Sequence, residues 1–314
     1  MDTNSSWITH PSDAYRAWQA EEAAGADRRP FSARSITQHV AMFDRFLRHL
    51  TAHRSTLATF GTAELDAFFE DVSNRCAPGT TTRIRYAKLV DRLCRHLVEL
   101  GIRQENPGQA LLRDEAWPDD EPRPLYLDPV ADGRLQEWVR PVAADSAREI
   151  RNRAIVALLL GTGATAAETR GARVDHLVLD HVRPHLAIPT RGARAERKLT
   201  VPSFATPALS TWLGCAQRTG DGREPLFPAP RGEGPVNDML LGMIVREALD
   251  AIGFRAPDMS PRVLRNTYAR RHLLAGRTNG DVTALLGLSS QRTVVRLRAT
   301  IGASPAGNTA ATAT

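Results

Sequence analysis

A repeating spacing of large apolar residues dominates the N-terminal third of the chain. These residues recur at intervals of three and four and so share one face of a helix: Ile36, Val40, Phe43, Leu47 and Leu50. The same spacing returns over residues 86–100, and a shorter apolar face covers 65–72. Three such faces need one another for burial. The pattern therefore predicts a small, all-helical domain over residues 32–112.

The segments around this domain have different compositions. Residues 1–31 show little periodicity and are predicted to form an N-terminal arm that is at best partly ordered. Residues 113–127 hold three prolines and seven charged residues, which is typical of an exposed linker. The low-complexity segment 302–314 is predicted to be a disordered tail. The remaining residues, 128–301, are predicted to form a second domain.

This second domain has mixed signals. Residues 148–160 predict an apolar-faced helix, and two strand-like segments flank Gly192 as a hairpin. Ser260 and Pro261 suit the N-cap and first turn of a helix that runs to Leu274. Further helices are predicted over 164–172, 203–217, 236–252, 281–286 and 290–299. The expected class is mainly α with a small β-hairpin or sheet, that is, α+β.

The charge distribution indicates a polyanionic partner. The net charge is +6, and residues 256–300 alone carry eight arginines against two aspartates. Clustered positive charge is typical of nucleic-acid binding, although solvated helix faces and an arginine-rich coding bias produce similar clusters. No stretch approaches the roughly 18 apolar residues of a membrane span. Three scattered cysteines predict a reducing cytoplasm, with neither metal site nor cofactor.

Three segments of the second domain resemble a known family. Residues 151–177, 186–202 and 260–290 follow, in order and spacing, the motif blocks of tyrosine recombinases, also called phage integrases. Residues 32–112 resemble the helical, SAM-like core-binding domain of the same family. The resemblance covers roughly 270 of the 314 residues. It implies a DNA-binding helical domain followed by a recombinase catalytic domain.

The resemblance also implies a set of site residues. In the family a tyrosine attacks a DNA phosphate, two arginines hold that phosphate, and a lysine and histidines handle protons. Here Arg265 matches the second arginine, Glu168 matches the supporting carboxylate, and Lys198 is the lysine nearest the hairpin position. Four of the family's positions hold other residues: Thr165 for the first arginine, Arg262 and Leu288 for histidines, and Leu297 for the tyrosine.

These departures predict a protein that binds DNA without cutting it. Leucine offers no nucleophilic atom, none of the four tyrosines follows residue 288, and Tyr268 suits packing within its helix. The predicted partner is double-stranded DNA at the nucleoid, with self-association or a related active recombinase as further partners. The alternatives are an active recombinase completed by a partner, and a protein-interaction scaffold. The predicted DNA contacts are Arg262, Arg265, Arg270, Arg271, Arg292, Arg296, Arg191, Arg194, Lys198, Arg83, Arg85 and Lys88.

Overall fold

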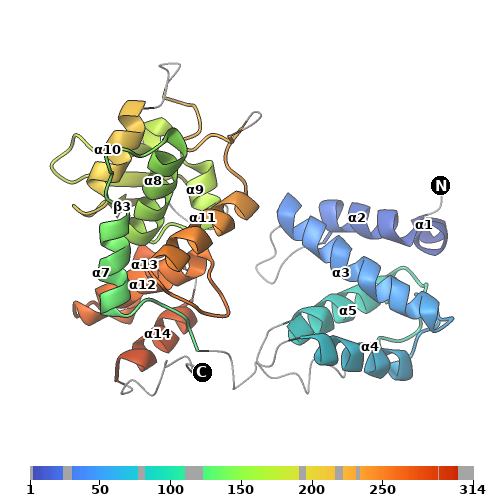
Figure 1. Ribbon diagram of the computed structural model, residues 1–314. Helices are drawn as coiled ribbons and strands as arrows, with labels where there is room; N and C mark the ends of the chain where they lie inside the picture. Colours follow the sequence, from blue (N-terminus) through green and yellow to red (C-terminus); the bar gives the residue numbers. More distant parts are fainter. Residues whose placement is uncertain are drawn as a thin grey trace. The chain divides into compact units, whose positions relative to one another are not determined.

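The chain forms two compact units, Met1–Pro122 and Arg123–Thr314. The computed structural model (Figure 1) describes residues 3–23, 30–76, 82–109, 123–190, 196–215, 222–230, 234–288 and 290–302. These residues are mostly helical, with one three-stranded sheet in the second unit. The predicted α+β class is therefore confirmed. None of the helices described is both long and apolar enough to cross a membrane.

The first unit is a helical bundle. Its described helices are α1 (Thr3–Thr9), α2 (Pro11–Glu21), α3 (Ala33–Ala52), α4 (Thr62–Arg75) and α5 (Thr82–Glu99). The helix α3 packs on α2, α4 and α5. Its apolar face supplies Phe43, Phe46 and Leu50, each with no exposed surface. The helical periodicity seen in the sequence is thus the face that this unit buries.

The predicted arm is wrong for residues 3–21, which fold as α1 and α2. Trp7 is 3% exposed and Tyr15 is 2% exposed within the core of the first unit. The Tyr15 ring stacks on Phe43 with 4.2 Å between ring centroids. A few large aromatic rings bury enough apolar area to hold two short helices in place, even without a long periodic pattern.

The second unit is built around α8 (Ala147–Thr162). This helix packs against five other helices and a strand of the sheet, and Ala154–Leu160 have no exposed surface. Such an all-round apolar helix is expected at the centre of a domain. Besides α8, the described part of this unit contains the helices α7 (Pro129–Trp138), α9 (Ala166–Gly171), η1 (Val174–His176), α10 (Thr206–Cys215), α11 (Asp238–Ala251), α12 (Pro261–Leu274), α13 (Asn279–Leu285) and α14 (Arg292–Gly302).

A small antiparallel sheet lies beside α8. It orders β1 (Leu177–Val178), β2 (His185–Ile188) and β3 (Arg197–Thr200) in sequence, with Leu186 opposite Leu199. The predicted hairpin corresponds to β2 and β3, and β1 extends it. Arg191 and Arg194, at the tip of the predicted hairpin, lie outside the described residues.

The start of α12 follows the predicted capping. Ser260 Oγ accepts a hydrogen bond from the Arg262 backbone N–H at 3.3 Å, Pro261 opens the first turn, and the helix ends at Leu274 as expected. Of the predicted linker, only 123–127 belongs to the described residues. The Asn266 side chain donates to Leu125 O at 2.8 Å, so the end of the predicted linker packs on α12. Of the predicted tail, residues 303–314 lie outside the described residues.

Candidate nucleic-acid interface

The candidate site lies where α9, β3, α12 and the turn after α13 meet. Thr165 is the N-cap of α9: its hydroxyl accepts from the Glu168 backbone N–H at 3.1 Å. The Glu168 carboxylate accepts from the Thr165 backbone N–H at 2.9 Å in return. This capping box satisfies two of the free donors at the helix start. At the position of the family's first arginine, the chain therefore has a capping residue.

Glu168 is paired with an arginine that the sequence analysis missed. Arg197 Nη2 on β3 lies 2.7 Å from Glu168 Oε1, and the two side chains are only 12% and 6% exposed. Burial alone would raise the pKa of Glu168. The Thr165 N–H and the charges of Arg197 and Arg265 outweigh it and hold that pKa below its usual value. Glu168 is therefore a buried carboxylate that the Thr165 N–H and the Arg197 guanidinium together favour in its ionised form.

Arg265 brings a second guanidinium group to the same place. It donates to Gly163 O, at the end of α8, and to Leu286 O at 2.5 Å. Arg197 also reaches Leu286 O, at 3.5 Å, and donates to Leu285 O at 3.2 Å. Arg197, Arg265 and Glu168 thus converge at the turn after α13. Together these three side chains have a net charge of +1.

The turn itself is shaped for this close approach. Gly287 has φ +60°, and a Cβ added there would lie 2.7 Å from Arg197 Nη1. A side chain at this position would displace the guanidinium group. Arg197 Nη1 is buried and has no hydrogen-bond partner among the residues that the structure describes. The site therefore keeps a buried donor for which an additional acceptor would be favourable.

Lys198 does not join this cluster. Successive side chains of a strand point to opposite faces, and in β3 Arg197 and Leu199 are more buried than the exposed Lys198 and Thr200. The lysine predicted nearest the site therefore lies on the outer face of the sheet. Its neighbour Arg197 reaches Glu168 instead.

The position expected for a tyrosine is part of an apolar core. Leu297 on α14 has no exposed surface and packs with Tyr268, Val282 and Val294. Leu288 is partly buried against the same cluster. Tyr268 is 3% exposed, and burial raises its pKa despite nearby arginines. Its predicted packing role is confirmed, and Leu297 has only a hydrocarbon side chain at the position expected for a tyrosine.

The other predicted arginines of α12 differ in their contacts. Arg262 is exposed at the helix start. Arg270 is half-buried, with its guanidinium 4.5 Å from the ring centroid of Tyr126. Arg271 pairs with Asp132 at 2.8 Å and donates to Leu160 O at 2.7 Å. These partners lie inside the unit, so the described contacts of Arg271 are packing contacts, and its role as a DNA contact stays a prediction.

The remaining predicted contacts lie on α5 and α14. Arg83 donates to Phe69 O at 3.2 Å and to Ser73 Oγ at 3.1 Å, so it joins α5 to α4. Arg85 and Lys88 are exposed on α5. On α14, Arg292 is exposed and Arg296 partly exposed.

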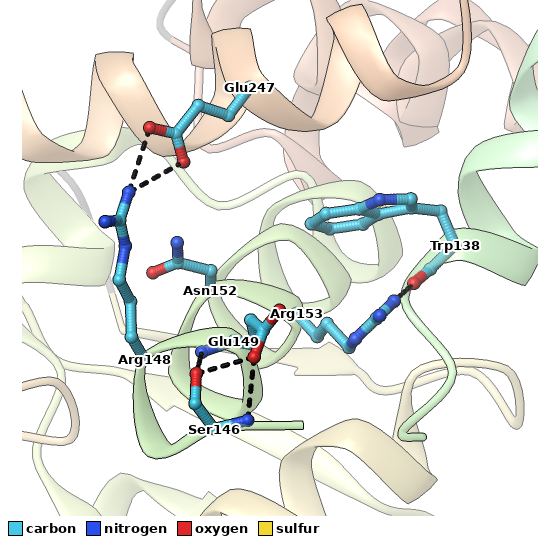
Figure 2. A pocket seen from close by; sticks show the side chains of 7 residues that line it. All are labelled: Trp138, Ser146, Arg148, Glu149, Asn152, Arg153 and Glu247. Atoms are coloured by element: carbon cyan, nitrogen blue, oxygen red, sulfur yellow. Dashed lines mark hydrogen bonds and ion pairs between the residues drawn. The ribbon is translucent and has the colours of Figure 1, made fainter. Parts of the chain in front are cut away.

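Figure 2 shows a pocket of about 460 Å³ that is lined by Ser146, Arg148 and Glu149. These residues belong to the start of α8, whereas Gly163 caps its other end. Figure 2 shows Arg148 paired with Glu247, at 3.1 Å, and the hydroxyl of the N-cap residue Ser146 donating to the Glu149 carboxylate, at 2.6 Å. Arg153 donates to the Trp138 carbonyl along the other wall. The drawn charges are thus satisfied by neighbouring groups of the protein, and this pocket is separate from the Glu168 cluster. The described residues hold no group of three or more His, Cys, Asp or Glu suited to a metal.

Known proteins of one family resemble this chain. The model of the phage integrase family matches residues 136–299. A tyrosine recombinase XerC of Xylella fastidiosa (strain M23) is 31% identical over 149 residues, which are 46% of this chain and 47% of that protein. XerC of Neisseria gonorrhoeae is 26% identical over 208 residues, 64% of this chain and 62% of the relative. The chain thus spans less than two thirds of the length of either relative.

Solved structures share the fold. The XerH site-specific recombinase bound to palindromic difH substrate superposes with a TM-score of 0.69 at 13% identity, over 95% of this chain and 90% of that one. The Tn1549 transposon integrase bound to a circular-intermediate DNA gives 0.65 at 14% identity, over 91% and 94%. The family match covers more than half of the 314 residues. The chain belongs to the phage integrase family, that is, to the tyrosine recombinases.

Proposed function

We propose that this protein is a non-cleaving member of its family that binds double-stranded DNA during recombination or integration of a mobile element. The observation that carries the proposal is Leu297. Its side chain fills an apolar core, and the resemblance in sequence expects the family's nucleophile at this position. A leucine cannot form the covalent phosphotyrosine on which strand exchange depends.

The retained positive charge supports DNA binding. Arg265 keeps the family's second arginine, and Arg262 replaces a histidine by a permanent cation that is exposed at the start of α12. An arginine can hold a phosphate through charge-assisted hydrogen bonds without taking part in proton transfer. The related XerH and Tn1549 proteins were solved bound to DNA. A protein with these arginines would occupy a recombination site on DNA, alone or beside an active recombinase.

A binding titration tests the proposal. We expect purified protein to bind a duplex from its own gene neighbourhood more tightly than a scrambled duplex of equal length, with affinity falling steeply between low and physiological salt. Arg262→Met should weaken binding to both duplexes and reduce the salt slope by about one, because one phosphate contact is lost.

The matched control is Arg140→Met. Arg140 is exposed in the same unit and pairs with Glu137 at 3.0 Å, at the end of α7. This variant should bind both duplexes like the wild type. Equal, weak binding of the wild type to the two duplexes would contradict the proposal and favour a protein-interaction scaffold.

A further inference from the structure

The first unit contains a cavity of about 210 Å³ between α2, α3 and α5. Three of its residues, Arg85, Lys88 and Arg92, lie on one face of α5, at intervals of three and four. Aromatic and apolar side chains form the rest of the wall. The described residues that line the cavity are Tyr15, Phe31, His39, Met42, Arg85, Lys88, Leu89 and Arg92.

The positive charge of this cavity is only partly compensated. Arg92 is half-buried, and burial lowers its pKa. Its guanidinium lies 4.9 Å from the ring centroid of Phe31, and it forms no hydrogen bond or ion pair with the part of the chain described here. Arg85 donates to the amide oxygen of Gln38, at 3.4 Å. None of the described lining residues is a carboxylate.

Other basic pockets of the chain differ in this respect. In the pocket between α3 and α4, Arg45 and Arg75 share Asp71 at 3.0 and 2.7 Å. In the pocket of Figure 2, Arg148 pairs with Glu247.

The charge of the neighbouring Asp91 raises the pKa of Arg92, but the Asp91 carboxylate already pairs with Arg95. A half-buried guanidinium without a carboxylate of its own is unfavourable, and an anion entering the α5 cavity would relieve it. Phosphate suits guanidinium groups because of its paired oxygens.

The aromatic wall adds a preference beyond charge. The Phe31 ring meets His39 edge-on, with 4.7 Å between centroids, while Arg92 lies over the same ring. His39 Nδ1 is 2.8 Å from Gln19 Oε1 and donates to it, which leaves Nε2 as an acceptor. Burial, Arg92 and Arg85 lower the pKa of His39, so this acceptor stays neutral.

We infer that the cavity binds a nucleoside monophosphate, with the phosphate at Arg85 and Arg92 and the heteroaromatic base along Phe31 and His39. Flat rings stack well on aromatic side chains and on guanidinium planes, and a neutral imidazole can accept from a base N–H. This inference goes beyond the proposed DNA-binding function and does not depend on it.

A phosphate next to a nucleoside is present both in a free nucleotide and at the phosphorylated end of a DNA strand. Calorimetric titration of the full chain with dAMP, with inorganic phosphate, and with a duplex carrying or lacking a 5′-phosphate separates the two sources. We expect dAMP to bind more tightly than inorganic phosphate. A preference for the 5′-phosphorylated duplex would identify a strand end as the ligand, and its absence would identify the free nucleotide.

Substitutions on α5 test whether Arg92 binds the phosphate of dAMP. Arg92→Met should lower dAMP affinity by about tenfold or more, because a charge-assisted contact is lost, whereas Arg92→Lys should retain part of the affinity. Arg95→Met is the control: Arg95 pairs with Asp91 on the same helix and does not line the cavity, so its affinity should stay within about twofold. Circular dichroism confirms that each variant folds.

Three results would overturn the inference: no dAMP binding at millimolar concentration, equal affinity for dAMP and inorganic phosphate, or equal effects of Arg92→Met and Arg95→Met. Because dAMP is titrated without duplex, a failure of the proposed DNA binding leaves this readout unchanged.

Discussion

Replacing Arg197 by alanine is expected to lower the free energy of unfolding of the second unit by about 3–5 kcal/mol, because the variant leaves a buried carboxylate without its partner. Glu168 is 6% exposed and lies 2.7 Å from Arg197. Its other contacts are one backbone N–H and the more distant charge of Arg265. The loss is measured by urea denaturation followed by circular dichroism.

Two further variants isolate the ion pair. Adding Glu168→Gln to Arg197→Ala removes the stranded charge and should recover a large part of the lost stability. Arg140→Ala breaks the exposed pair with Glu137, whose side chains are 65% and 66% exposed, and should cost less than about 1 kcal/mol. If the double variant were no more stable than Arg197→Ala, the pairing of the two charges would not explain the effect.

The pH dependence of this loss has a definite sign. The folded-state pKa of Glu168 lies below its ordinary value of 4.5, so the stability it contributes is present above that pH and is lost as the pH falls through the folded pKa. The difference between wild type and Arg197→Ala should therefore shrink on acidification below about pH 4.5. A difference that grew in acid would contradict the assignment of an ionised Glu168.

Replacing Leu297 by alanine is expected to destabilise the second unit by about 2–5 kcal/mol, because it opens a cavity in a small core. Leu297 has no exposed surface, and its cluster includes only a few other large side chains, among them Tyr268 and Leu286. The same denaturation experiment measures the loss.

Val295→Ala is the matched control on α14. Val295 is 49% exposed on the same helix, and surface truncations usually change stability by about 0.5 kcal/mol or less. Equal losses in the two variants would show that Leu297 does not anchor α14.

The sequence predicted those parts of the fold that depend on local signals. The periodic face of α3 and the Ser260–Pro261 start of α12 are read from residues a few positions apart. The burial of Trp7 and Tyr15 could not be predicted in this way, because it depends on contacts with α3 and α5, which lie far along the chain.

The candidate site shows the same limit more sharply. Thr165, Glu168 and Arg265 follow from motif positions, but the partner of Glu168 is decided by which face of β3 looks inward. A shift of one residue in strand register exchanges the two faces, so Arg197 and Lys198 cannot be told apart from the sequence. Only the observed pairing of Ile188 with Arg197, and of Ala187 with Lys198, settles it.

We propose that this chain binds duplex DNA without forming a covalent bond to it. The most direct measurement incubates the purified protein with a labelled, nicked duplex from its gene neighbourhood and divides each sample between a native gel and a denaturing gel. An active XerC relative serves as the positive control. We predict a shifted complex on the native gel and no labelled protein on the denaturing gel. A protein–DNA adduct that survives denaturation would contradict the account.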